Sequence, residues 1–328
     1  MLNQRKLGNQ GLEVSELGLG CMGMSQSYGT PNDSESIATI HRALDLGVDF
    51  FDTAEVYGPF TNEKLLGLAL KGKRHQAIVA TKFGFKIVDG KIEGVDSHPK
   101  HIQKVVEESL KRLGLEHVDL LYQHRVDPEV PIEEVVGCMG QLVKQGKVRF
   151  LGLSEAGEEN IRRAHRTHPI SALQSEYSLW ERNLEKRIIP LLRELHIGLV
   201  PFSPLGRGFL TGDVKPAEEY PEDDYRRRDP RFQGENFEAN KHIASVIQEM
   251  AKSKQATASQ VAIAWLLHLG NDIVPIPGTK RRTFLEENLN AAKLVLSQDE
   301  MKVLSDTFSP GVTSGVRYGE QQMRLIDR

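Results

Sequence analysis

The chain has 328 residues, 27% charged and 39% hydrophobic, with a formal net charge of −3 at pH 7 and a pI near 6.4. This composition is typical of a globular protein, and its dispersed basic residues give no support for nucleic-acid binding. No apolar run approaches the roughly 18 residues that a membrane span needs, and no apolar signal core follows the first residues. Two cysteines, Cys21 and Cys138, are too few for a disulfide framework. We therefore expect a cytoplasmic protein with reduced thiols.

A short hairpin over residues 5–15 is predicted first, because Leu7, Leu12 and Val14 give an apolar side and Asn9, Gln10 and Gly11 a turn. Short apolar runs then alternate with amphipathic segments of helical period. The expected strands are 17–20, 48–52, 77–81, 118–122, 148–153, 171–174, 197–201 and 272–275. The expected helices are 33–46, 61–71, 99–113, 131–145, 158–167, 185–195, 237–252 and 282–289.

Eight strands that alternate with helices predict an α/β fold with a parallel sheet. Their number and the chain length favour a closed (β/α)8 barrel, or TIM barrel, with an N-terminal β-hairpin and extra helices. We find no linker and expect one domain over residues 1–328. Two stretches break the pattern. Residues 213–236 are charged and rich in proline, as expected of a long excursion, and the tail over about 309–328 has no clear period and is expected to be mobile.

The segment Gly18-Leu19-Gly20-Cys21-Met22-Gly23 matches the dinucleotide fingerprint G-x-G-x-x-G. In a Rossmann fold a helix opens within this motif and holds the pyrophosphate at its N-terminus. Here a loop-like stretch, residues 24–31, follows instead, so we reject a Rossmann domain. The glycines are explained by close packing and a tight exit from the first strand.

Two later loops suit a phosphate group, because barrels commonly bind phosphate after strands seven and eight. Residues 201–208 contain two glycines, Ser203 and Arg207, and guanidinium groups bind phosphate oxygens well. Residues 277–282 contain Thr279, Lys280 and Arg282 and lead into a helix, whose N-terminus favours anions. The alternative is that these cations are only exposed charges, and the placement in a barrel favours phosphate.

Four polar residues are predicted to meet at one rim of the barrel, where strand ends carry catalytic groups. Asp52, Lys82 and His124 each lie at the end of an apolar run, and Tyr57 lies in a loop after the second strand. Singly, each has an ordinary explanation: a helix cap, a surface lysine, a packing histidine and a loop anchor. Their convergence on one rim favours a catalytic site.

This set of residues suits carbonyl reduction. A phenol with a pKa near 10 is a poor proton donor and acceptor at pH 7, and lowering that pKa by about 3 units takes about 4 kcal/mol. We expect the Lys82 ammonium, held by Asp52, to lower the pKa of Tyr57. Tyr57 would then donate the proton as a hydride reaches the carbonyl carbon, and His124 would orient the carbonyl.

The chain resembles the aldo-keto reductases over nearly all its length, because Asp52, Tyr57, Lys82 and His124 match that family's tetrad in order and setting. The resemblance implies a (β/α)8 barrel that uses NADPH without a Rossmann fold and reduces small aldehydes or ketones, with no metal. Residues 18–22, 124–128 and 201–208 are similar to the branch that contains perakine reductase and the auxin-induced-like reductases. By resemblance, the cofactor-binding residues are Met22, Ser154, Gln174, Phe202, Ser203, Leu205, Arg207, Gly278, Thr279, Lys280, Arg282, Glu287 and Asn288.

The resemblance assigns Ser154 and Gln174 to the nicotinamide carboxamide and Phe202 to stacking on its ring. Ser203, Leu205 and Arg207 would line the pyrophosphate, and Gly278, Thr279 and Lys280 the 2′-phosphate, with Glu287 and Asn288 near adenine. Two positions depart from the family pattern. Glu155 follows Ser154 where better-known members have Asn, and Phe284 replaces an arginine that grips the 2′-phosphate.

Two other functions compete with reduction. Lys82 could form a Schiff base in an aldolase-type barrel, with the cationic loops holding a substrate phosphate. The same family also includes barrels that serve as β subunits of potassium channels, where partner binding matters more than catalysis. The substrate and the oligomeric state are not specified by sequence. Trp180 suits either a wall of the substrate pocket or a packed anchor, and we expect the wall; whether residues 213–236 close over the cofactor is not specified by sequence.

Overall fold

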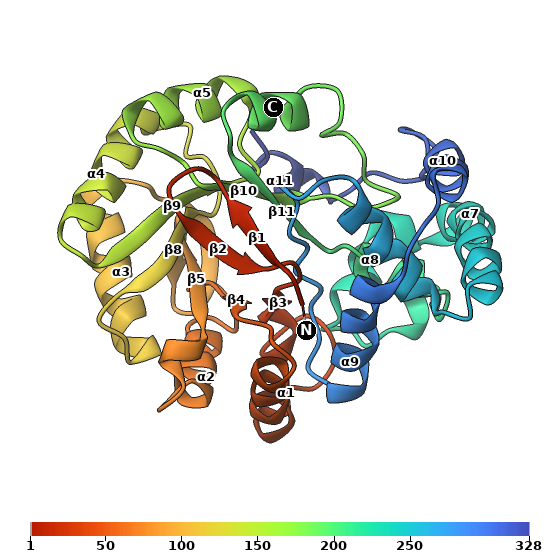
Figure 1. The fold of residues 1–328 in the computed structure, drawn as a ribbon. Coiled ribbons are helices and arrows are strands. Elements are labelled where there is room, and N and C mark those ends of the chain that lie inside the picture. Colours follow the sequence, from red (N-terminus) through yellow and green to blue (C-terminus); the bar gives the residue numbers. More distant parts are fainter. Residues whose placement is uncertain (1, 328) are drawn as a thin grey trace.

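The computed structural model describes residues 2–327, and its centre is a parallel sheet of seven strands that curls into a nearly closed barrel (Figure 1). The strand order is β11-β10-β9-β8-β5-β4-β3, so the strands neighbour each other in chain order. Their bounds are β3 Leu19–Gly20, β4 Phe50–Asp52, β5 Ile78–Phe83, β8 Val118–Gln123, β9 Val148–Ser154, β10 Ala172–Glu176 and β11 Gly198–Phe202. The predicted barrel class is confirmed, and seven of the eight expected strands are found within a few residues.

The eighth expected strand, residues 272–275, is not a regular strand, but this segment closes the barrel. Val274 N–H donates to Leu199 O at 2.8 Å on one side, and Gly18 N–H donates to Pro275 O at 3.0 Å on the other. Pro275 and Pro277 have no backbone N–H, so a continuous ladder of hydrogen bonds is impossible here. Isolated bridges, Leu199 with Ile273 and Gly20 with Gly278, replace it.

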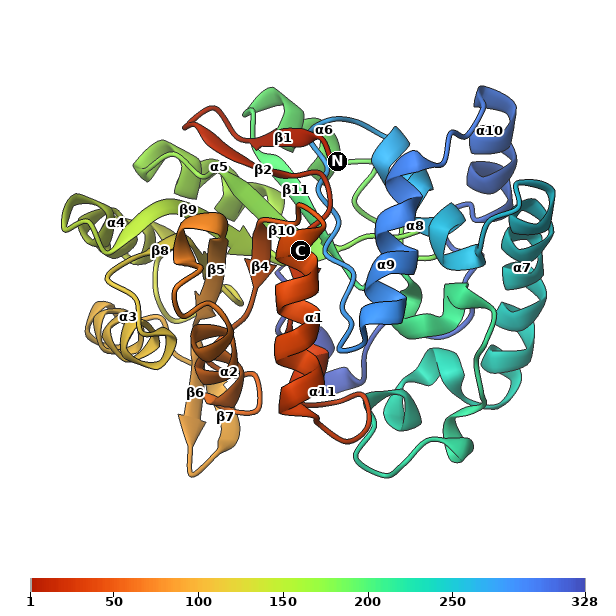
Figure 2. The ribbon, with the colours of Figure 1, turned by 60° about the horizontal axis from the view of Figure 1, so that its bottom comes forward.

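Two antiparallel hairpins lie at opposite ends of the barrel (Figure 2). The predicted hairpin is formed by β1 (Gln4–Leu7) and β2 (Leu12–Ser15) and covers the end where the strands begin. It is tied down by buried Arg5, which donates to the carbonyl oxygens of Ile273 at 2.6 Å and Gly270 at 2.8 Å. The second hairpin, β6 (Phe85–Val88) with β7 (Lys91–Val95), was not predicted and projects from the end where the strands finish.

Helices surround the sheet (Figure 1). They are α1 Asp33–Asp45, α2 Thr61–Ala69, α3 Pro99–Leu113, α4 Ile132–Lys144, α5 Glu158–Thr167, α6 Ile188–Glu194, α7 Gly234–Ser253, α8 Ala258–His268, α9 Arg282–Asn290, α10 Gln298–Thr307 and α11 Glu320–Met323. Their start signals follow the sequence: Asn32 caps α1 by accepting from Glu35 N–H, and Pro99 opens α3. The apolar helix α8 was not predicted, because its residues are buried nearly all round and lack a clear one-sided pattern. Among the described helices, none is long and apolar enough to cross a membrane.

The excursion and the tail both lie against the barrel rim. Residues 213–236 form three short 3₁₀ helices, and Tyr225 N–H donates to Ser27 O at 2.9 Å in the loop before α1, beside which the excursion runs in Figure 2. In the tail, Arg317 and Tyr318 are buried. Asp327 accepts from Gly157 N–H at 2.8 Å and so caps the start of α5.

Candidate active site

The four residues predicted to meet do so at the end of the barrel where the parallel strands finish. Asp52 is the last residue of β4, Lys82 lies near the end of β5, and His124 follows β8 directly. These three strands are neighbours, since Asp52 pairs with Ala80 and Lys82 with Tyr122. Tyr57 returns to the same place from the loop after β4. All four side chains are buried, Lys82 completely.

Lys82 is the centre of this cluster. Its Nζ donates to Asp52 Oδ1 at 2.5 Å, to the carbonyl oxygen of Thr53 at 2.9 Å and to the Tyr57 hydroxyl oxygen at 3.0 Å. From β10, Gln174 Nε2 donates to the other Asp52 oxygen at 2.7 Å. The ammonium is therefore fixed in position, and its contact with the phenol oxygen does not depend on solvent.

The Asp52–Lys82 pair keeps the lysine charged. Burial alone would lower the pKa of Lys82, but Asp52 and Tyr57 outweigh it, and the pKa is raised above its ordinary value. Burial also raises the pKa of Asp52, against the opposing effect of Lys82. A Schiff-base lysine must be able to lose its proton to attack a carbonyl. A raised pKa therefore weighs against the aldolase alternative.

The expected lowering of the Tyr57 pKa is wrong for this structure. Burial raises the pKa of the phenol, Lys82 lowers it and Asp52 raises it again, and the sum is an increase above 10.0. The main reason is that the buried phenolate would lose its hydration, and Asp52 offsets part of the lowering that the Lys82 ammonium provides. Tyr57 is consequently a protonated phenol at neutral pH, which is the form of a proton donor.

His124 stands edge-on to Tyr57, with ring centroids 5.9 Å apart and an interplanar angle of 84°. Burial, with the nearby charges of Arg125 and Lys82, holds the pKa of His124 well below 6.5, so the imidazole is neutral at pH 7. Its buried Nδ1 has no hydrogen-bond partner within residues 2–327. A neutral imidazole beside the phenol can donate one hydrogen bond to a bound oxygen without adding charge.

Apolar side chains surround the Tyr57 ring. Ala54, Val56, Tyr57 and Phe85 form one buried cluster, and Met22, Ile87, Val95 and Leu325 pack against it. They come from the exits of β3 and β4, the β6–β7 hairpin and the tail. A substrate carbonyl beside Tyr57 would therefore be next to apolar groups.

The prediction that Trp180 forms a wall of the pocket is wrong. Its side chain is buried against Phe209, with ring centroids 4.7 Å apart, and against Phe232, at 6.3 Å. Both phenylalanines belong to the region between β11 and α7, so Trp180 anchors that region. Sequence reasoning could not distinguish a wall from an anchor, because either role suits an aromatic residue.

The residues expected at a nicotinamide lie around the same rim. Ser154 ends β9, Gln174 lies in β10, Phe202 ends β11, and Met22 begins the 3₁₀ turn after β3. Ser154 and Gln174 are buried, whereas Phe202 and Met22 are partly exposed. Gln174 is also bound to Asp52, a contact that the sequence did not predict.

The loop after β11 contains Ser203, Leu205 and Arg207, which were expected at a pyrophosphate. Several of its residues have left-handed backbone, with φ of 49° at Ser203, 58° at Arg207 and 95° at Gly208. Successive residues of this kind can turn their amide groups toward an anion. A Cβ on Gly208 would meet Arg226 Nη1 at 3.7 Å, an ordinary van der Waals contact, and no closer atom.

Arg207 itself does not fit the predicted contact with a pyrophosphate. Its buried guanidinium pairs with Glu176 Oε2 and with Asp229 Oδ2, each at 2.8 Å. Two carboxylates already satisfy its charge, because the excursion folds back and delivers Asp229. Sequence reasoning missed both partners, which lie 31 and 22 residues from Arg207.

The loop before α9 gathers the other predicted phosphate ligands, and Gly278 and Thr279 lead into it. Lys280 Nζ donates to the carbonyl oxygens of Tyr28 at 2.8 Å, Gly29 at 3.1 Å and Thr30 at 2.7 Å, so it also clamps the loop before α1. Arg282 pairs with Glu35 at 3.0 Å. Phe284 is exposed, and the Arg281 guanidinium lies 5.6 Å from its ring centroid.

The two residues expected near adenine both lie in α9. Glu287 accepts from Thr257 Oγ1 at 2.8 Å, which links α9 to the cap of α8. Asn288 is buried.

One further residue of the rim was missed: Arg125, directly after His124, donates to Ser154 Oγ at 3.3 Å. Because Arg125 directly follows a candidate catalytic histidine, the sequence alone could have pointed to it as a residue of the site.

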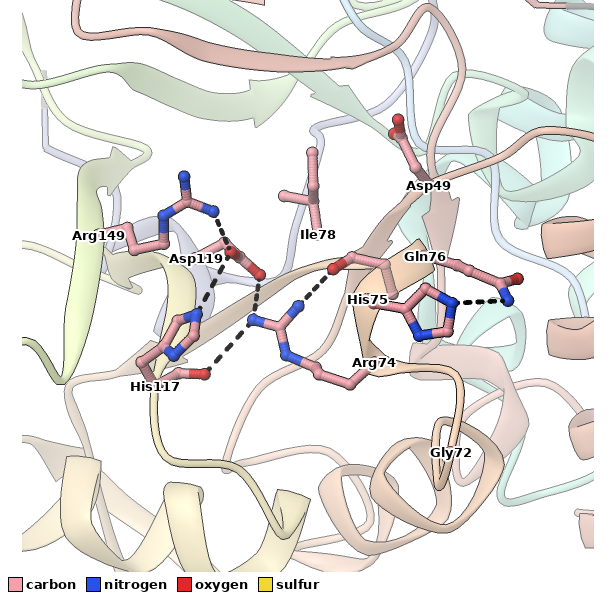
Figure 3. A pocket seen from close by; sticks show the side chains of 10 residues that line it. Asp49, Gly72, Arg74, His75, Gln76, Ile78, His117, Asp119 and Arg149 are labelled. Atoms are coloured by element: carbon pink, nitrogen blue, oxygen red, sulfur yellow. Dashed lines mark hydrogen bonds and ion pairs between the residues drawn. The ribbon is translucent and has the colours of Figure 1, made fainter.

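A separate cavity of about 690 Å³ lies at the opposite end of the barrel (Figure 3). Its walls include Arg74 and Arg149, which pair with Asp119 at 2.6 and 3.0 Å near the starts of β5, β8 and β9. Asp119 is buried and also accepts from Val79 N–H at 2.8 Å. Residues at this end of a barrel usually serve stability, and these ion pairs tie three strands together.

The chain is similar in sequence and in structure to known oxidoreductases. The chain is 48% identical over 318 residues to "Probable aldo-keto reductase 1" of Glycine max, which covers 95% of this chain and 91% of that protein. Among solved structures, a glycerol dehydrogenase from Gluconobacter oxydans superposes with a TM-score of 0.86 at 30% identity, covering 95% of this chain and 97% of the other. An aldo-keto reductase from Bacillus halodurans, in its holo form, gives 0.78 at 25% identity, covering 98% and 100%.

A model of the Aldo/keto reductase family matches residues 16–307, from the end of the first hairpin to the end of α10. This range includes every strand of the barrel and all four residues of the rim cluster. The family is one of oxidoreductases that reduce carbonyl compounds with a nicotinamide cofactor. The chain belongs to the aldo/keto reductase family.

Proposed function

We propose that this protein reduces aldehyde or ketone carbonyls to alcohols with NADPH, and that Asp52, Tyr57, Lys82 and His124 are its catalytic residues. The observation that carries the proposal is the buried Lys82 ammonium, which contacts both Asp52 and the Tyr57 hydroxyl. A phenol held this way, beside a neutral imidazole and apolar walls, suits proton donation to a carbonyl oxygen. We also assign the chain to the perakine reductase and auxin-induced-like branch, on residues 18–22, 124–128 and 201–208.

In this proposal each residue has one task. His124 donates a hydrogen bond to the substrate carbonyl oxygen and orients it toward Tyr57. Tyr57 gives its proton to that oxygen as the carbonyl is reduced, and Lys82 stabilises the phenolate that remains. Asp52 holds Lys82 in place and keeps it charged. A bound nicotinamide supplies the hydride that adds to the carbonyl carbon.

The residues around the rim fit such a cofactor. Ser154 and Gln174 offer polar groups beside the cluster, and the left-handed loop of 203–208 offers backbone amide groups for a diphosphate. The start of α9 gathers Lys280, Arg281 and Arg282, and a helix N-terminus favours a phosphate. Arg207 is left out of this set because Glu176 and Asp229 bind it.

The proposal is tested by mixing the protein with NADPH or NADH and following two signals, quenching of intrinsic fluorescence and oxidation of the nicotinamide with a small aldehyde. We expect tighter binding of NADPH and turnover of the aldehyde. Binding of neither nucleotide would overturn the reductase assignment. In that case, borohydride trapping with a carbonyl compound would test Lys82 for a covalent adduct.

Replacing Lys280 with Ala is expected to weaken NADPH binding about tenfold, a loss of about 1.4 kcal/mol, and NADH binding less. The reason is that only NADPH has the 2′-phosphate that this cation would contact. Arg42→Ala is the control, since it removes an exposed cation that pairs with Glu286 of α9, and both affinities should stay unchanged. An equal loss for the two nucleotides would mean that Lys280 acts only by clamping residues 28–30.

The pH dependence of kcat follows from the shifted pKa values of His124 and Tyr57. His124 is neutral above its lowered pKa, and Tyr57 is protonated below its raised pKa. We therefore expect kcat for reduction to be level between pH 6.5 and 10.0, the ordinary values of the two groups. Alcohol oxidation needs the phenolate as proton acceptor, so its kcat should rise with pH over the same range. Profiles of kcat in both directions test this, and a fall in reduction inside the window would contradict it.

A further inference from the structure

We propose that Arg317, in the C-terminal tail, is a positioning residue for the reaction. It holds Glu155 and Glu176, and through them the ends of β9 and β10, so that Ser154 and Gln174 keep their places at the reaction centre. This inference rests on the proposed function. Arg317 Nη2 lies 2.5 Å from Glu155 Oε2, and Nε lies 3.1 Å from Glu176 Oε2. The side chains of Arg317, Glu155 and Glu176 are 5%, 3% and 0% exposed, so water screens neither ion pair.

Glu155 is placed where its side chain can join two strands. It follows Ser154 directly, and its φ of 53° lies in the left-handed region, which is costly for a residue other than glycine. Glu155 Oε1 accepts from Ser175 Oγ at 2.9 Å and from Glu176 N–H at 2.8 Å, both in β10. The carboxylate thus bridges β9 to β10 through one oxygen, and Arg317 neutralises it through the other.

Glu176 makes the second link. Three guanidinium groups surround it, those of Arg207 at 2.8 Å, Arg317 at 3.1 Å and Arg231 at 3.7 Å. Glu176 and Gln174 are two residues apart in β10, so their side chains lie on the same face of the strand. Gln174 donates to Asp52 at 2.7 Å, and a displacement of Glu176 would therefore be passed to the Asp52–Lys82 pair.

Without Arg317, the buried Glu155 carboxylate would have no cation of residues 2–327 in contact with it. Such a group moves toward water or takes up a proton, and either change would disturb the backbone next to Ser154. The tail does not depend on Arg317 alone, because Thr313 Oγ1 donates to Trp180 O at 2.8 Å and Ser314 N–H donates to Asn240 Oδ1 at 2.9 Å. These contacts make it possible to disturb the tail and the ion pairs separately.

The test compares Arg317→Met with Thr313→Val, which removes a tail hydrogen bond away from Glu155. With saturating NADPH and aldehyde, below the Tm of each variant, we expect Arg317→Met to lower kcat about 10- to 100-fold, as a small misplacement of reacting groups does. KM for the aldehyde should change far less. Thr313→Val should lower the Tm but keep kcat within about twofold, and Arg317→Lys should recover part of kcat because it restores the charge.

Several outcomes decide the inference. If Arg317→Met lowers the Tm but keeps kcat within about twofold of wild type, Arg317 is only structural and the proposal is overturned. If Arg317→Met does not fold, Arg317→Gln is judged by the same criterion, since it also removes the cation but keeps a polar side chain in the buried site. If the wild-type protein binds NADPH but reduces no carbonyl compound, the proposed function fails, and a change in kcat can no longer support Arg317.

Discussion

The Tyr57→Phe variant is expected to lose about 10²- to 10⁴-fold in kcat for carbonyl reduction, the range typical of removing a general acid. The phenol is the one group of the cluster that carries a transferable proton at neutral pH, because Lys82 is held by Asp52 and His124 is neutral. The substitution removes one oxygen and leaves the ring in its apolar cluster. NADPH affinity and Tm should change little, so the loss should fall on kcat.

A buried tyrosine elsewhere provides the control. The Tyr177 hydroxyl donates to Glu185 Oε1 at 2.8 Å, in a contact between the end of β10 and the segment before α6. Tyr177→Phe likewise removes a hydroxyl from a buried tyrosine but should keep kcat within about twofold. A Tyr57→Phe protein that keeps more than a tenth of wild-type kcat would show that another group, or water, donates the proton.

The barrel and its catalytic rim could be predicted because both depend on local signals. Short apolar runs such as 118–122 alternate with helical periods, and parallel strands bring their ends to one rim. Asp52, Lys82 and His124 each lie at or near the end of such a run, so their convergence needs only the fold. The eighth strand, residues 272–275, was predicted to be regular. Pro275 and Pro277 interrupt its backbone hydrogen bonds, so only isolated bridges form, although the segment still closes the barrel.

Contacts between segments that lie far apart in the chain could not be predicted from the sequence. Arg207 looked like a phosphate ligand because a cation in a glycine-rich loop is typical of one, but Asp229 and Glu176 reach it only in the folded chain. Glu155 looked like a departure from the family pattern, and its partner, Arg317, lies 162 positions later in a tail without any periodic pattern. The sign of the Tyr57 pKa shift also depended on burial, which a list of neighbours does not give.

The Lys82→Met variant is expected to lose both activity and stability. Methionine has a similar length but no charge, so Asp52 would be buried with Gln174 as its remaining side-chain donor. Breaking a buried ion pair by removing one partner typically costs about 3–5 kcal/mol, and the Tyr57 phenolate would lose the cation that stabilises it. We expect kcat to fall by at least about 10²-fold and the denaturant midpoint to fall with it.

Adding Asp52→Asn to Lys82→Met separates these two losses. The amide removes the unpaired buried charge, so the double variant should recover most of the lost stability, as neutral replacements of buried ion pairs often do. It restores no cation beside Tyr57, so kcat should stay low. The stability loss of Lys82→Met alone should also shrink at acidic pH, because burial already raises the pKa of Asp52 and its neutral form is favoured once Lys82 is absent. If the double variant regained wild-type kcat along with its stability, Lys82 would be a packing residue, and the role assigned to its ammonium would have to be abandoned.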